Sequence, residues 1–206
     1  MHRTANNSAK RTHFRRTWVS AWILGLLSFV LHVLGMPQVI RAQSTADEYQ
    51  VKAAFLFHFA QFLDWPADSP NAADPSLSLC IFGDEPHRQD IQSTLEGKVI
   101  GPRAFLVRLV SQPQDIQGCN ILFLSRDEVR RQAATLKSLR GMRVLTVGET
   151  ADFISDGGMI RFHLEGGRIR FDINLAAAES SHLQISSRLL LLASTVIRAG
   201  DADRGR

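Results

Sequence analysis

The stretch that decides the fold is GCNILFLSRDEVRRQAATLKSLRGMRVLTV, residues 118–147. It holds two short apolar runs, 119–124 and 143–147, of the kind that form buried strands. The intervening segment predicts a helix that extends to about Leu139. Ser125 followed three residues later by Glu128 predicts a capping box at the start of this helix. The order strand, helix, strand is typical of an α/β fold.

Alternating strand and helix patterns continue upstream. The sequence predicts a strand over 77–82, a helix over 86–95, and a strand over 98–110 with a kink at Gly101-Pro102. The strands are almost continuously apolar, which indicates a sheet covered on both faces. We therefore expect a single compact α/β domain with a mixed, mostly parallel sheet covered by helices.

An amphipathic helix is predicted ahead of these elements, over residues 47–65. Asp47 suits the N-cap position, and Trp65 precedes a proline, which disfavours helical backbone. Residues 67–76 are predicted to form a loop. The apolar residues of this helix recur at spacings of three and four and so share one face: Val51, Phe55, Phe59 and Phe62. We expect this face, together with Leu190 and Ala193, to belong mostly to the core.

The pattern changes to strict alternation after residue 158. Residues 159–164 and 168–173 alternate with period two around Glu165-Gly166-Gly167, which predicts a β-hairpin. The remaining predicted elements are a short helix capped by Asn174, a brief strand at 183–185 and a final helix over 188–197. The four leucines of the final helix are expected to pack on the sheet.

The first 42 residues have the order of a secretory signal peptide. Six basic residues and no acidic residue accompany an apolar run over 18–35, and the small residue Ala42 suits a cleavage site. An uncleaved membrane anchor is the alternative, because the apolar run approaches the length of a spanning helix. Either way, we expect residues 43–200 to form an exported domain and residues 201–206 to form a frayed tail.

The net charge changes sign once this leader is set aside. The whole chain has 24 basic and 20 acidic residues, so the part after residue 42 has 24 − 6 = 18 bases against 20 acids. A mildly acidic domain lacks the long-range attraction to phosphate backbones that nucleic-acid binding requires. We expect no nucleic-acid partner, and contact with the membrane only through the leader or a bound protein.

Cys80 and Cys119 are the only cysteines. In an exported protein a single pair predicts a disulfide, and two buried free thiols are the alternative. No CxxC or HxxxH spacing accompanies them, so no metal site is expected.

Signatures of catalysis are missing from the sequence. It lacks the GxSxG, SxxK, HExxH, P-loop and GxGxxG motifs. The histidines after the leader have no ligand spacing: His58, His87, His163 and His182. We therefore expect a protein that is not an enzyme and has no cofactor.

Two features of the later sequence are candidate contact sites. Gly157-Gly158 permits either a tight turn or close backbone approach to a ligand. Arg168 and Arg170, with Arg161 on the other strand of the hairpin, form either a basic stripe for a carboxylate or phosphate, or a solvated face.

An apolar contact with a partner is a third candidate. Phe153, Ile154 and Met159 are bulky residues in a region that is rich in turn-forming residues. They belong either to the core or to an interface. Phe153, between Asp152 and the Asp156-Gly157 turn, is the candidate for a functional contact.

Seven ordered segments resemble the YfiR-like family of exported proteins, and together they cover about residues 47–198. The matching segments are EYQVKAAFLFHFAQFLDWP (48–66), LCIFGD (79–84), CNILFLS (119–125), LTV (145–147), GGMIRF (157–162), RFDINLAAA (170–178) and ISSRLL (185–190). Each motif is weak alone, whereas the ordered set is specific.

The resemblance implies a periplasmic α/β domain that forms homodimers. It also implies a negative regulator that binds the periplasmic sensor region of an inner-membrane diguanylate cyclase, lowering cyclic-di-GMP and biofilm formation. Family members with a second disulfide carry two further cysteines in the later part of the chain, and this sequence has neither. Redox sensing through a second bond is therefore not expected. A periplasmic small-ligand binding protein, with Gly157, Gly158 and the hairpin arginines as its site, is the alternative function.

Overall fold

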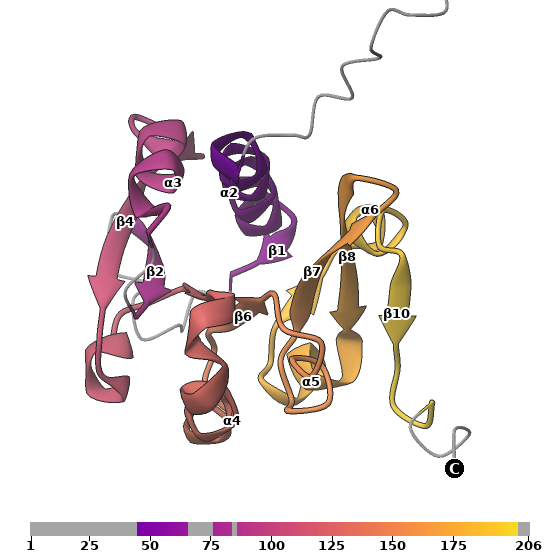
Figure 1. Ribbon diagram of the computed structural model, residues 1–206. Coiled ribbons are helices and arrows are strands. Elements are labelled where there is room, and N and C mark those ends of the chain that lie inside the picture. Colours follow the sequence, from indigo (N-terminus) through magenta and orange to yellow (C-terminus); the bar gives the residue numbers. More distant parts are fainter. Residues whose placement is uncertain (1–44, 66–75, 84–85, 202–206) are drawn as a thin grey trace, which may run out of the picture. The chain divides into compact units, whose positions relative to one another are not determined.

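The central feature of the fold is an eight-stranded mixed sheet with the strand order β10-β8-β7-β6-β5-β2-β4-β3 (Figure 1). The computed structural model describes residues 45–65, 76–83 and 86–201. Contacts divide the chain into residues 1–41 and 42–206, and every described residue belongs to the second unit. The predicted leader and most of the predicted loop and tail lie outside the described residues.

The secondary structure alternates between strands and helices along most of the chain. The strands of the large sheet are β2 (Ser76–Phe82), β3 (Val99–Ile100), β4 (Arg103–Val110), β5 (Ile121–Leu124), β6 (Leu145–Gly148), β7 (Ile160–Glu165), β8 (Arg168–Asn174) and β10 (Thr195–Ile197). A separate two-stranded sheet pairs β1 (Leu63–Asp64) with β9 (Gln184–Ile185). The helices are α2 (Thr45–Gln61), α3 (Arg88–Leu95), α4 (Val129–Ser138), α5 (Leu175–Ser180) and α6 (Ser187–Leu190), with short 3-10 helices η1 (Pro113–Ile116) and η2 (Arg126–Glu128).

Parallel pairing dominates the large sheet. β2 pairs in parallel with both β4 and β5, β5 with β6, and β6 with β7. The chain passes from β2 to β4 on one side and then crosses to β5 on the other, so a topological switch point lies between β2 and β5. The predicted mixed, mostly parallel α/β sheet is confirmed.

Two hydrophobic clusters cover opposite faces of this sheet. Leu79 and Ile81 of β2 pack in the cluster that contains Phe59 of α2, whereas Cys80 and Phe82 belong to a second cluster. Side chains alternate between the faces of a strand, so this division follows from the sequence of β2. Ile91 of α3 joins the first cluster and Leu136 of α4 joins the second. The prediction that helices cover both faces is confirmed.

The predicted disulfide is present between Cys80 in β2 and Cys119 just before β5, with 5.8 Å between their Cα atoms. The bond closes a segment with a sequence separation of 39. It ties together the two strands that flank the topological switch point.

We expect the double variant Cys80→Ala/Cys119→Ala to lose about 2–4 kcal/mol of unfolding free energy. Without the cross-link, its unfolded chain has the higher entropy of an open loop. Urea denaturation measures this loss. Thiol titration of the denatured, unreduced wild type is the companion measurement, and the finding of two free thiols would contradict the bond.

The prediction of a final helix over 188–197 is wrong. α6 ends at Leu190, and Thr195–Ile197 form β10, which pairs in parallel with β8. Thr195, Val196 and Ile197 are β-branched residues that favour a strand beside the open edge of β8. As a result Leu189 is buried, whereas Leu191 and Leu192 are 85% and 60% exposed.

Two other elements differ in detail from the prediction. Gly101-Pro102 does not kink a single strand; it reverses the chain, so β3 and β4 form an antiparallel pair. α2 ends at Gln61, four residues before the expected end, because Leu63 and Asp64 pair with β9. By contrast, the predicted β7–β8 hairpin is present, and Gly166 and Gly167 both have positive φ in its two-residue turn.

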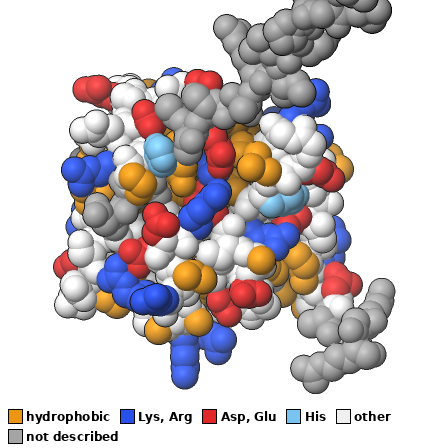
Figure 2. All heavy atoms as spheres, in the orientation of Figure 1, with side chains coloured by type: hydrophobic (Ala, Val, Ile, Leu, Met, Phe, Trp, Pro, Cys, Tyr) orange, Lys and Arg blue, Asp and Glu red, His pale blue; other side chains and the backbone are white. Residues whose placement is uncertain are grey.

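Figure 2 shows basic and acidic side chains interspersed over the described face. This mixed pattern agrees with the small net charge of the part after the leader.

Candidate functional site

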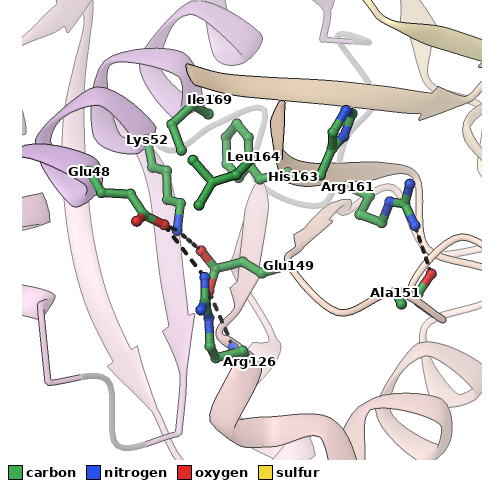
Figure 3. Close-up of a pocket in the computed structure, with 10 residues that line it drawn as sticks. Glu48, Lys52, Arg126, Glu149, Ala151, Arg161, His163, Leu164 and Ile169 are labelled. Atoms are coloured by element: carbon green, nitrogen blue, oxygen red, sulfur yellow. Dashed lines mark hydrogen bonds and ion pairs between the residues drawn. The ribbon is translucent and has the colours of Figure 1, made fainter. Parts of the chain in front are cut away.

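A pocket of about 400 Å³ lies where α2, the ends of β5 and β6, and the strand β7 meet (Figure 3). We call it the α2–β7 pocket. It is lined by Glu48, Lys52, Arg126, Glu149, Ala151, Arg161, Phe162, His163, Leu164 and Ile169. Its volume falls within the range of small-molecule and cofactor sites.

The order of elements explains how charged residues gather there. Arg126 lies two residues after β5 and Glu149 directly follows β6. The carboxyl ends of parallel strands meet at one edge of a sheet, so these residues become neighbours. Glu48 and Lys52 lie one turn apart on α2 and therefore face the same edge.

A cluster of four charged residues lines one part of the pocket: Glu48, Lys52, Arg126 and Glu149. Lys52 bonds to Glu48 at 2.5 Å and also to Glu149, whose side chain is only 1% exposed. Glu149 accepts further hydrogen bonds from the Tyr49 hydroxyl and from the backbone N–H of Arg126, both at 3.2 Å. Each buried charge thus has an opposite charge beside it, as burial of ions requires.

The Arg126 side chain is the most exposed charged group of this cluster. It lies 3.5 Å from a Glu48 oxygen and 3.8 Å from a Glu149 oxygen, and its side chain is 59% exposed. A guanidinium has five N–H donors, so most of its hydrogen-bonding capacity remains for a ligand.

A second ion pair lies on the outer face of the hairpin. Arg161 donates to Asp172 at 2.6 and 3.2 Å and to the carbonyl of Ala151 at 2.9 Å. His163 Nδ1 lies 3.4 Å from Asp172, but its buried nitrogen makes no hydrogen bond in the described structure. Asp172 therefore holds Arg161 in place beside the pocket.

The Glu128 side chain lies against Gly83, beside the topological switch point. A Cβ atom on Gly83 would lie 1.9 Å from Oε1 of Glu128, so a larger residue at this position would displace the carboxylate. Glu128 accepts a hydrogen bond from Arg131 at 2.7 Å, and this bond raises the pKa of the Arg131 guanidinium. The predicted capping box is therefore wrong: Glu128 turns away from the helix start, and the buried Ser125 hydroxyl makes no hydrogen bond among the described residues.

The prediction that Phe153 makes a functional apolar contact with a partner is wrong, because the residue belongs to the core. Its side chain is fully buried, and its ring lies between Gly148 and Gly158, where an added Cβ would come within 2.2 Å of it. These two glycines provide the space that the ring occupies. Met159 is also buried, whereas Ile154 is half-buried. Gly157 has a φ of +99°, which a turn requires.

We expect Gly158→Ala to lower the unfolding free energy by about 1–3 kcal/mol, because the new methyl group overlaps the Phe153 ring. Urea denaturation measures the effect. Adding Phe153→Leu should recover part of the loss, since it removes the atoms that clash. Equal stability of Gly158→Ala and wild type would contradict this packing.

The structure does not bring the other predicted contact residues into one site. Arg168 and Arg170 are exposed on the outer face of the hairpin, and Arg170 lies 3.6 Å from Glu165. Gly157 lines a separate pocket of about 300 Å³. Of the arginines discussed for the hairpin, Arg161 alone lines the α2–β7 pocket.

Sequence reasoning missed the charged cluster of Glu48, Lys52, Arg126 and Glu149. Two signals were present. A Glu and a Lys occur at i and i+4 on an otherwise apolar helix, and charged residues follow two buried parallel strands. Together these signals place four charges at one sheet edge.

The fold and pocket define a small α/β domain with a pocket at the carboxyl edge of its sheet. The chain belongs to the YfiR/HmsC-like family, whose model matches residues 49–194. Members of this family are regulators, and the disulfide fits an oxidising compartment.

Among solved structures, the chain is similar to the ABC domain in complex with L-Trp from Streptococcus pneumonia, with 9% identity and a TM-score of 0.46. The likeness covers 59% of this chain and 55% of that one. A likeness of this size carries no argument about function.

The described residues contain no helix that is both long and apolar enough to cross a membrane. The same residues hold no cluster of histidine, cysteine and acidic side chains suited to a metal ion.

Proposed function

We propose that this protein is a non-enzymatic periplasmic regulator that represses an inner-membrane diguanylate cyclase by binding its periplasmic sensor region. Membership of the YfiR/HmsC-like family over residues 49–194 is the observation that carries the proposal. Repression of this enzyme would lower cyclic-di-GMP and biofilm formation.

Export supports the proposed location. Residues 1–42 carry the charge pattern of a secretory signal, and the protein forms a disulfide between its two cysteines. Disulfides persist in oxidising compartments such as the bacterial periplasm. We propose that residues 43–200 act there as the regulatory domain, whether the leader is cleaved or kept as an anchor.

A homodimer is part of the proposal. The resemblance to the family supports it, as does the outer edge of the sheet, where, in the described part of the chain, β3 pairs only with Arg103 and Ala104 of β4. Leu106 and Leu109 of β4 are about half exposed. Light scattering of the purified protein tests the oligomeric state, and a monomer at micromolar concentration would count against the dimer.

The decisive experiment is co-expression with a candidate cyclase that has two membrane spans, a periplasmic segment and a GGDEF-type domain. Repression requires that the regulator bind one conformation of the sensor better than another. We therefore expect lower cellular cyclic-di-GMP and a pull-down that depends on the periplasmic segment. A cyclase with this segment deleted is the control. Unchanged cyclic-di-GMP, together with no pull-down, would refute the proposal for that cyclase.

Binding of a small ligand is the second candidate function. The pocket beside Gly157, with Leu136, Leu139 and Met159 in its walls, supports it. A thermal-shift panel of amino acids and cell-wall fragments tests it, because any ligand that binds the folded state raises the melting temperature.

A further inference from the structure

Among the residues that the structure describes, no strand pairs with the end of β7 that borders the α2–β7 pocket. β6 ends at Gly148, which lies opposite Arg161, whereas β7 continues to Glu165. Three consecutive β7 residues, Phe162, His163 and Leu164, line the pocket. Side chains alternate between the two faces of a strand, so three consecutive lining residues indicate that the pocket runs along the backbone edge.

The strand register identifies the backbone groups on this edge. The N–H of Asn174 donates to the carbonyl of Met159 at 2.7 Å, so hydrogen-bonded pairs between β7 and β8 recur at every second residue from Met159. Phe162 and Leu164 fall between these pairs, and their peptide groups point away from β8. Among the described residues, no strand lies opposite this edge beyond Arg161. The Phe162 carbonyl and both peptide groups of Leu164 therefore border the pocket.

These groups form an acceptor, a donor and an acceptor in a line. A neighbouring strand offers the complementary pattern, and addition of a peptide strand to a sheet edge is a common mode of recognition. The apolar side chains of Leu164 and Ile169 in the pocket wall suit the alternating side chains of such a peptide.

The charges of the pocket favour an acidic peptide. Glu149 is engaged by Lys52, Tyr49 and the backbone of Arg126, and Glu48 is bonded to Lys52. The exposed Arg126 guanidinium keeps free donors at the pocket, and a carboxylate is the group that matches its geometry.

We propose that the α2–β7 pocket binds an extended acidic peptide segment of a partner protein. The segment adds as a strand to the free edge of β7 and places a carboxylate on Arg126. Only the identity of the partner rests on the proposed function; the binding mode follows from the edge and its charges.

The test compares two substitutions of one residue in the protein purified from cells that express the full chain. Leu164→Pro removes the N–H that faces the pocket and spares the hydrogen bonds to β8, whereas Leu164→Ala removes only side-chain atoms. Phage-displayed random dodecapeptides are selected on the wild type. We expect enrichment of peptides with Asp or Glu, and binding about tenfold weaker to Leu164→Pro than to Leu164→Ala, as the loss of one hydrogen bond implies.

Charge reversal gives an independent readout. Selection on Arg126→Glu should replace the acidic preference with a basic one. Melting temperatures confirm that each variant is folded. If Leu164→Pro is unfolded, amide exchange of Leu164 in the wild type replaces it, and a selected peptide must slow this exchange. No enrichment on the wild type, or equal peptide binding by both Leu164 variants, would overturn the inference.

A second arm separates this inference from the proposed function, using the purified periplasmic region of a diguanylate cyclase. Equal binding of that region to wild type and Leu164→Pro would refute strand addition and leave the regulatory proposal standing. Selected peptides that bind while the cyclase region does not would refute the cyclase as partner and support the peptide site.

Discussion

Phe59→Ala should lower the unfolding free energy by about 3–5 kcal/mol, the range for truncation of a buried Phe. The Phe59 side chain has no exposed surface, and its ring centroid lies 5.6 Å from that of Phe162 and 5.0 Å from that of Phe171. Truncation leaves a cavity between α2 and the β7–β8 hairpin. Urea denaturation followed by circular dichroism measures the loss.

Leu192→Ala is the matched control for this prediction. Leu192 is 60% exposed, so we expect its truncation to change the unfolding free energy by less than about 0.5 kcal/mol. A loss below about 1 kcal/mol for Phe59→Ala would contradict the buried position of this helix face.

Lys52→Ala should lower the unfolding free energy by an amount similar to Phe59→Ala, because it leaves a buried charge unpaired. Lys52 and Glu149 are both almost fully buried, so loss of the ammonium leaves the Glu149 carboxylate without its main counter-ion. Removal of one partner of a buried ion pair costs about 3–5 kcal/mol. Urea denaturation at neutral pH measures the effect.

A double variant separates charge from packing at this site. Lys52→Met/Glu149→Gln removes both charges and keeps similar side-chain volumes. We expect it to be more stable than Lys52→Ala, because the Glu149 position, the most deeply buried of the cluster, no longer carries an unpaired charge. If the double variant is the less stable of the two, packing rather than charge dominates at this position.

Much of the fold could be predicted because local pattern and tertiary structure agree. The apolar runs of β2, β5 and β6 become the buried parallel strands, and Glu165-Gly166-Gly167 forms the hairpin turn. Asn174 accepts the hydrogen bond from the Ala177 N–H that its capping role predicts. The final helix could not be predicted from its leucines, because the open edge of β8 draws Thr195–Ile197 into the sheet.

The candidate site was harder to predict for a physical reason. Its charges come from α2 and from the ends of β5 and β6, and only the sheet brings them together. The sequence pattern favoured candidate residues that lie close together in the chain around Gly157. Phe153 shows why this failed: its neighbouring glycines make room for its own ring and not for a partner.

The Glu128 carboxylate, which lies over Gly83, competes with any free ligand that approaches this position beside the topological switch point. A tethered side chain acts as an intramolecular competitor, with an effective concentration in the millimolar range or above. A ligand that binds over Gly83 would have to outcompete the tethered carboxylate and also separate Glu128 from Arg131. We therefore expect weakly binding solutes to be excluded from this position, whereas the α2–β7 pocket, which Glu128 does not line, is free of this competition.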